Sequence, residues 1–164
     1  MDAMFDGYPR VLTLVAAVGA GLVAGVFFAF STFVMRALRE LPDAQGISAM
    51  QAINRAAPSP LFMTALFGSA VVCVALAVSA LTRLGEPAAR YQLAGSAVYL
   101  AGAVVLTIVY HVPRNDALAV VDPTGAGAAG MWRHYLAGWT AWNHVRTLTS
   151  LAAAVILALA LRVE

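Results

Sequence analysis

Long apolar runs separated by shorter polar stretches make up most of this chain. Three runs contain no charged residue and extend from Val11 to Met35, from Leu61 to Leu81 and from Tyr91 to Tyr110. A helix that crosses a bilayer needs about 20 apolar residues, so each run is long enough. A fourth run, Val145 to Leu161, includes Arg146 and reaches this length only if the helix begins earlier. The pattern predicts four transmembrane helices, at about 11–35, 60–81, 91–111 and 139–161.

The connections between these runs differ in length and polarity. The first, residues 36–60, contains a segment from Ile47 to Arg55 whose apolar positions recur at helical spacing, so a short extra helix is expected there. Residues 82–90 are few enough to predict a tight antiparallel hairpin. The third connection, from His111 to about His144, is expected to be the longest and the most polar. The chain is therefore predicted to be all-α, an integral membrane four-helix bundle forming a single domain, residues 1–164.

Composition agrees with a location in lipid. Hydrophobic residues make up 62% of the chain and charged residues 11%, whereas charged residues are about a quarter of a soluble domain. The formal net charge is +2, but every basic residue is an arginine and most lie beside the ends of apolar runs, where arginine anchors helices to lipid headgroups. We therefore expect membrane lipid, and no nucleic acid, as a partner.

Asp2 and Asp6 precede the first run, unlike the basic start of a signal peptide, so this span is expected to be retained in the mature protein.

The orientation in the membrane is inferred from charge near the span ends. A simple count of arginines favours the side of the two long connections as cytoplasmic. The hairpin at 82–90, with Arg83 and Arg90, favours the side of the termini. We favour the second interpretation, in a multi-pass protein of the bacterial cytoplasmic membrane.

One polar stripe leads into the last apolar run. Trp139, Trp142, Asn143 and Arg146 lie at positions i, i+3, i+4 and i+7, on one side of a helix. An arginine exposed to lipid costs about 2.5–3.5 kcal/mol near the bilayer centre and less towards the interface. The stripe is therefore expected to face the interior of the bundle. In the alternative, Arg146 reaches the headgroups and both tryptophans join an aromatic belt, which leaves Asn143 unexplained.

A second polar cluster follows the third apolar run, around His111 and Asn115. Pro113 lies between them and cannot continue a regular helical hydrogen-bond ladder, so nearby carbonyl groups need partners. Asn115 or Arg114 could provide them, and a substrate-binding role is an equal alternative. His111 could exchange a proton near neutral pH.

Other chemistries find little support in the sequence. The three histidines, His111, His134 and His144, match no compact metal-ligand spacing, and no acidic residue lies in any predicted span. No nucleophile elbow, phosphate-binding loop or dinucleotide fingerprint is present, which argues against hydrolase, kinase and nicotinamide chemistry.

Three motifs together resemble the DUF1772, or anthrone oxygenase-like, family of small four-span membrane proteins. They are Met50–Arg55, His111–Leu118 and Trp139–Thr147, and the resemblance covers nearly the whole chain. It implies a membrane-embedded oxygenase that oxidises a polycyclic aromatic enol, of the anthrone to anthraquinone type, with dioxygen as co-substrate and no other cofactor. The positions that match the family's motif residues are Asn54, Asn115, Trp142, Asn143 and Arg146.

The implied reaction suggests a role for each residue. Loss of a proton from an anthrone methylene gives an electron-rich enolate, which reacts with dioxygen without a metal. Such a site needs a base, a group that stabilises the enolate oxygen, and flat apolar walls. On the resemblance, His111 is the candidate base, Arg146, Asn143 and Asn54 stabilise the oxyanion, Asn115 binds substrate, and Trp139 and Trp142 form walls.

Two alternatives remain open at this level. The first is a non-catalytic protein that binds a small hydrophobic molecule in the same pocket, or assembles with a partner or a second copy through its first span, where Gly21 and Gly25 share one face. The second is a haem or copper protein with His111 and His144 as ligands. A shared site predicts that Asn54, Asn115, Asn143 and Arg146 converge on one cavity near the long connections, beside Phe27–Phe33.

Overall fold

The computed structural model describes residues 8–163, which are mostly helical and contain no strand. Asp2 and Asp6, on which the expectation about the first span partly rests, lie outside these residues. The first long helix comprises α2 (Tyr8–Ala29), η1 (Phe30–Val34) and α3 (Met35–Glu40), and the second α5 (Pro60–Met63), η2 (Thr64–Gly68) and α6 (Ser69–Leu81). The third comprises α7 (Pro87–Tyr99), η3 (Leu100–Val105), η4 (Thr107–His111) and α8 (Val112–Ala119), and the fourth is α9 (Ala128–Ala160).

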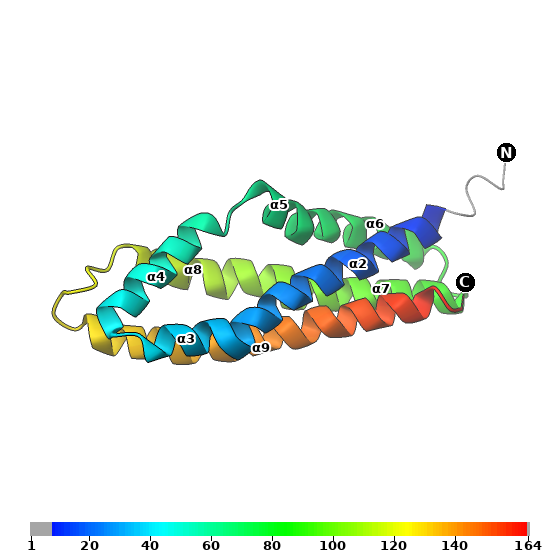
Figure 1. Ribbon diagram of the computed structural model, residues 1–164. Coiled ribbons are helices and arrows are strands. Elements are labelled where there is room, and N and C mark those ends of the chain that lie inside the picture. The colour runs from blue at the N-terminus through cyan, green and yellow to red at the C-terminus, as the bar shows by residue number, and fades with distance from the viewer. Residues whose placement is uncertain (1–7, 164) are drawn as a thin grey trace.

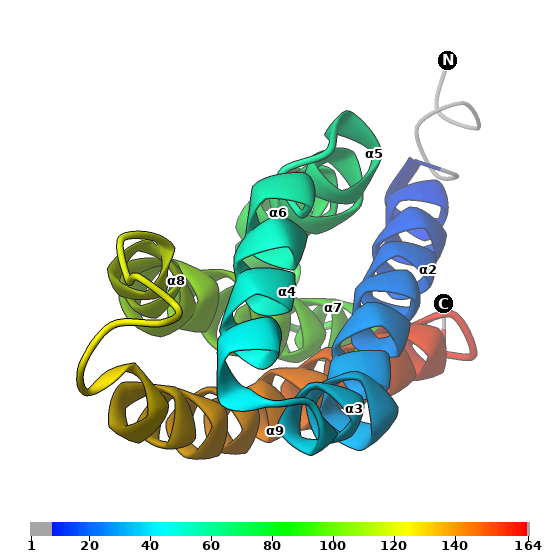
Figure 2. The same ribbon diagram turned by 60° about the vertical axis from the view of Figure 1, so that its left-hand side comes forward.

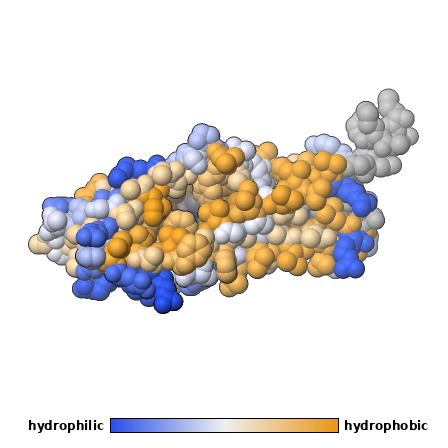
Figure 3. Space-filling model, in the orientation of Figure 1, coloured by the Kyte–Doolittle hydropathy of each residue, from blue (hydrophilic) through white to orange (hydrophobic). Residues whose placement is uncertain are grey.

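The predicted all-α fold class is confirmed. Four continuous helices are long and apolar enough to cross a membrane, at Tyr8–Glu40, Pro60–Leu81, Pro87–Ala119 and Ala128–Ala160. The short extra helix of the first long connection is α4, Asp43–Ala56. In Figure 3 the surface is mostly apolar along the middle of the molecule and polar towards both ends, the distribution that a bilayer requires of a spanning protein.

The third connection is much shorter than predicted from the sequence. The third helix continues past Pro113 to Ala119, and α9 begins at Ala128, so only residues 120–127 connect the two helices. The wider π-helical turn η4 directly precedes α8, and such turns are one way in which membrane helices accommodate a proline that lacks a backbone donor. Gly127, with a φ of 85°, supplies the left-handed conformation from which α9 starts.

Helix α9 lies at the centre of the packing and contacts both α2 and α7. Glycines allow these close approaches. A Cβ atom at Gly95 would lie 2.7 Å from Cγ of Leu157, and one at Gly102 would overlap the side chain of Thr149. On α2, Gly21 faces Ala154 of α9, whereas nothing lies within 4 Å of a Cβ built at Gly25. Close packing against small residues is the usual association mode of membrane helices.

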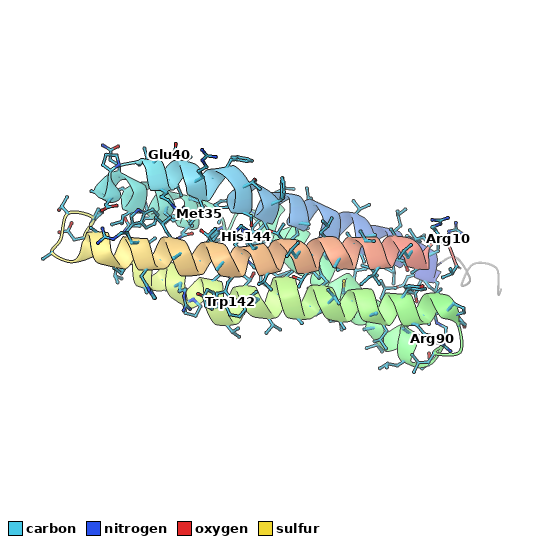
Figure 4. The ribbon with its side chains drawn as sticks, turned by 90° about the horizontal axis from the view of Figure 1, so that it is seen from below. Arg10, Met35, Glu40, Arg90, Trp142 and His144 are labelled. Atoms are coloured by element: carbon cyan, nitrogen blue, oxygen red, sulfur yellow. The ribbon has the colours of Figure 1, made fainter. Side chains whose placement is uncertain are left out.

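The arrangement separates two ends of the molecule. The start of α2 and the end of α9 lie together at one end, and α4 crosses the opposite end near α8 and the connection at 120–127 (Figure 1). Arg10 and Arg90 lie at the first end and Glu40 at the second (Figure 4). Among the described elements, the backbone of α5 lies close only to that of η2, which continues it, and Figure 2 shows α5 standing apart from α2.

Candidate functional site

A pocket of about 430 Å³ lies between α2, η1, α4 and α5, and α8 and α9 contribute further lining residues. Its volume falls in the range of about 300–1,000 Å³ typical of small-molecule sites. Most of the lining is apolar, with Phe27 and Phe30 from the first long helix and Phe62 from the second. The polar lining residues are Asn54, Ser59, Asn115, Trp139 and Arg146.

The guanidinium of Arg146 is held in place by neutral groups and aromatic rings. Its side chain is only 5% exposed. Nη1 donates to Oγ1 of Thr107 at 3.1 Å and Nη2 donates to Oδ1 of Asn143 at 2.7 Å. Its central carbon lies 4.2 Å from the ring centroid of Phe27 and 5.2 Å from that of Trp139. These contacts fix the orientation of a positive charge at the pocket.

This charge has no acidic partner in the part of the chain that the structure describes. Ion pairs there are formed by other arginines, namely Arg36, Arg83 and Arg133. Nε of Arg146 is buried without a hydrogen-bond partner. A buried charge without a counter-ion is costly, and an anionic group of a ligand would relieve that cost. The site is therefore suited to binding or stabilising an oxyanion.

Asn143 lies behind the pocket and supports Arg146. Its side chain is fully buried and does not line the pocket. Nδ2 of Asn143 donates to the carbonyl of Phe27 at 2.7 Å and to Oγ of Ser31 at 2.8 Å, which leaves Oδ1 for the guanidinium. Asn143 thus links α9 to the first long helix and orients the arginine.

A second hydrogen-bonded group joins α4, α8 and α9 beside the pocket. Oδ1 of Asn115 accepts from the hydroxyl of Tyr135 at 2.8 Å and from Nε1 of Trp139 at 2.9 Å. Nδ2 of Asn54 donates to the same hydroxyl at 3.4 Å. Two asparagines from distant parts of the chain are therefore bridged by one tyrosine.

His111 is buried next to the pocket but does not line it. The imidazole is 1% exposed, and Nδ1 lies 3.3 Å from the carbonyl oxygen of Leu106. Nε2 has no hydrogen-bond partner. The ring packs edge-on against the indole of Trp139 at 5.1 Å between centroids, and that indole does line the pocket.

Trp142 lies on a different side of α9 from Trp139. It is 43% exposed and contacts the ring of Tyr110 at 5.1 Å, towards the third long helix (Figure 4). Phe27 and Phe30 contribute the aromatic walls of the pocket together with Trp139. The structure thus places Trp139 alone of the two predicted tryptophans at the pocket.

The histidines do not gather in the structure. His111 is buried, whereas His134 and His144 are exposed on α9. Between residues 8 and 163 no group of three or more His, Cys, Asp or Glu side chains is placed to hold a metal ion.

The structure brings Asn54, Asn115 and Arg146 to one pocket, with Asn143 bonded to the arginine from behind. Sequence reasoning missed Tyr135, whose hydroxyl joins the two pocket asparagines. Tyr135 lies four residues before Trp139 and therefore on the same face of α9. Extending the polar stripe backwards by one turn would have found it, but this segment was expected to be part of a connection.

Part of the chain matches a known protein family. Residues 61–156 match the sequence model of a family described as anthrone oxygenase. The matched segment contains His111, Asn115, Trp139, Asn143 and Arg146 and begins after Asn54. No curated protein and no solved structure matches the chain.

Proposed function

The chain belongs to the anthrone oxygenase family, and from this premise we propose that it is a membrane-embedded oxygenase that converts a polycyclic aromatic enol to a quinone. The observation that carries the proposal is the buried guanidinium of Arg146, which has no acidic partner among the described residues and lies at an apolar, aromatic pocket. The proposed location is the bacterial cytoplasmic membrane, with both termini in the cytoplasm.

The pocket fits a flat aromatic substrate. Phe27, Phe30 and Trp139 offer ring surfaces on which a polycycle can stack, and aromatic pairs contribute about 0.5–1.5 kcal/mol beyond the area that they bury. With an aromatic ring system between these walls, one oxygen of the substrate lies towards Arg146. The pocket is therefore suited to an apolar ring system that carries an oxygen atom at its edge.

Arg146 acts in the first chemical step. Removal of a methylene proton from an anthrone places negative charge on the carbonyl oxygen across the ring, and the guanidinium stabilises this enolate. A single pre-organised oxyanion donor typically contributes about 10²–10³ in rate. Asn143 holds the guanidinium through the 2.7 Å hydrogen bond and is a positioning residue.

Dioxygen completes the reaction. The enolate carbon forms a bond to one oxygen atom of dioxygen, and the resulting peroxide takes up a proton. The second proton then leaves the same carbon as the bond between the two oxygens breaks, which produces the second carbonyl and releases water. One oxygen atom of dioxygen enters the quinone and the other leaves as water, so dioxygen accepts all the electrons that the substrate loses.

His111 is the proposed proton acceptor. Its unpartnered Nε2 is buried behind the indole of Trp139, so direct contact with substrate requires that this indole shift. His111→Gln and Arg146→Met are both expected to reduce turnover of an anthrone. Wild-type turnover in both variants would contradict the proposal.

The test is dioxygen consumption by purified protein in detergent or in liposomes. Anthrones oxidise slowly in air, so the rate without protein is subtracted. The proposal predicts that one dioxygen is consumed for each quinone formed. Metal analysis and the visible absorbance spectrum of the same sample test the alternative in which haem or copper is bound.

A non-catalytic binding protein is the second candidate, and one observation favours it. No histidine, aspartate or glutamate is among the residues that line the pocket. Such a protein would bind the same aromatic molecules without using dioxygen. Saturable binding of an anthrone with no dioxygen uptake above the protein-free rate would establish this function instead.

A further inference from the structure

The hydrogen bonds around Asn115 determine which way its amide points. Nε1 of Trp139 is a donor only, because an indole nitrogen has no lone pair to accept a hydrogen bond. The atom of Asn115 that lies 2.9 Å from it must therefore be the oxygen, Oδ1. The amide nitrogen of Asn115 then points elsewhere, and it has no hydrogen-bond partner among the described residues.

The orientation of the side-chain amide of Asn54 also follows from its hydrogen bond. The hydroxyl of Tyr135 has one hydrogen, which it donates to Oδ1 of Asn115 at 2.8 Å. It can then only accept from Asn54, whose nearest amide atom, at 3.4 Å, must be the donor Nδ2. Oδ1 of Asn54 is left as an acceptor without a partner in the described residues. A donor-only indole thus sets the orientation of two asparagines, one directly and one through a tyrosine.

Arg146, Asn115 and Asn54 all line the pocket, and the two asparagines each keep one amide atom without a partner among the described residues, a donor on Asn115 and an acceptor on Asn54. Because both asparagines bond to the same hydroxyl of Tyr135, this donor and this acceptor belong to neighbouring side chains, and a phenolic hydroxyl, which accepts one hydrogen bond and donates another, can satisfy both. An ether oxygen accepts only, and a ring hydrogen does neither.

We propose that Asn54 and Asn115 bind a second oxygen function of the substrate, a free ring hydroxyl. Nδ2 of Asn115 donates to this hydroxyl, which in turn donates to Oδ1 of Asn54, while the oxygen at the reacting end of the ring system faces Arg146. The inference rests on the proposed function for the identity of the ring system. It adds that Asn54 and Asn115 are the residues that recognise a hydroxyl group on this ring system.

The experiment measures equilibrium binding of unreactive quinones to the full-length protein in detergent micelles, by isothermal titration calorimetry. The ligands are anthraquinone, its two monohydroxy isomers and their methyl ethers. One hydroxy isomer is expected to bind about tenfold more tightly than anthraquinone, since two net hydrogen bonds contribute about 1–2 kcal/mol and 1.4 kcal/mol is tenfold. Its methyl ether is expected to lose this gain.

Two variants assign the preference to the asparagines. Asn54→Leu removes the acceptor. Asn115→Leu removes the donor without adding an acceptor to which the hydroxyl could donate. Both are expected to bind the hydroxy isomer no more tightly than anthraquinone. Ser48→Ala, an exposed change on the same helix as Asn54, is expected to keep the wild-type preference.

The wild-type ligand series tests the proposal without any substitution. Equal binding of all five ligands would overturn it, and so would a hydroxyl preference that both variants retain. The hydroxyl site and the oxygenase activity can be refuted separately. A hydroxyl preference without dioxygen uptake supports the asparagine site and refutes the oxygenase, whereas dioxygen uptake without a hydroxyl preference refutes only the asparagine site.

Discussion

Arg146→Met is the most informative change in this protein, because it removes a buried charge while keeping a flexible side chain. Two hydrogen bonds from the guanidinium are lost, each contributing about 1.5–3 kcal/mol when one partner is charged. The charge itself costs about 2.5–3.5 kcal/mol within the membrane, and this cost disappears. The net destabilisation is therefore about 1.5 kcal/mol, the difference between the centres of these ranges, which lowers the melting temperature by about 3–6 °C in a chain of this size.

The effect on function should be larger than the effect on stability. Loss of the oxyanion donor is expected to reduce turnover of an anthrone by about 10²–10³ per folded molecule. The assay is dioxygen uptake at a temperature below the melting point of both proteins, with folded protein quantified by size-exclusion chromatography. Arg146→Lys keeps the charge but loses the planar fork, so a partial rate is expected.

Arg114→Met is the matched control for this prediction. Arg114 is also an arginine on a long helix and lies over the ring of Tyr110 at 3.5 Å, but it does not line the pocket. Its replacement is expected to change turnover by less than about twofold. The reasoning is refuted if Arg146→Met turns over substrate as fast as the wild type, or if the two variants lose activity equally.

Three further outcomes follow from local contacts. Asn143→Leu removes the partner of a buried donor, Nη2 of Arg146, and of a buried acceptor, the carbonyl of Phe27. It is expected to destabilise the protein by about 1–3 kcal/mol and to lower turnover, measured by thermal unfolding and dioxygen uptake, and unchanged values of both would contradict its supporting role. Gly95→Ala should cost about 1–3 kcal/mol through overlap with Leu157, and in the double variant with Leu157→Ala the loss should be smaller than the sum of the single losses. Hydrogen bonds from Thr124 hold the pKa of Asp122 in the folded protein below its usual value. These bonds therefore stabilise the fold at pH values above the usual pKa, and the stabilisation is lost as the pH falls through the lowered pKa of the folded state. Thr124→Ala should raise this pKa in an NMR titration, and an unchanged value would contradict the assignment.

The positions of the membrane helices could be predicted because the length of an apolar run is a local property of the chain. The ends of the last two helices could not. Hydropathy measures apolarity, whereas helicity also continues through polar segments that pack against a neighbour. Trp132 illustrates this, since it lies in the segment expected to be a connection and is fully buried on α9 in a cluster with Met35 and Met50.

In the candidate site, too, local features could be predicted and features that depend on packing could not. The inward orientation of Arg146 was predictable from its own helix, because the spacing of the polar stripe and the cost of a charge in lipid are both local. The burial of His111 behind Trp139 was not, because it depends on how α9 packs against the third long helix.

The sequence by itself determined that this protein has four membrane helices and that one of them turns a positive charge inward, since hydrocarbon penalises any other arrangement of those residues. Only the tertiary structure decided which polar groups share the pocket. Asn54, Asn115 and Arg146 come from three different helices, α4, α8 and α9. They meet at the pocket because α4 and α8 both pack against α9.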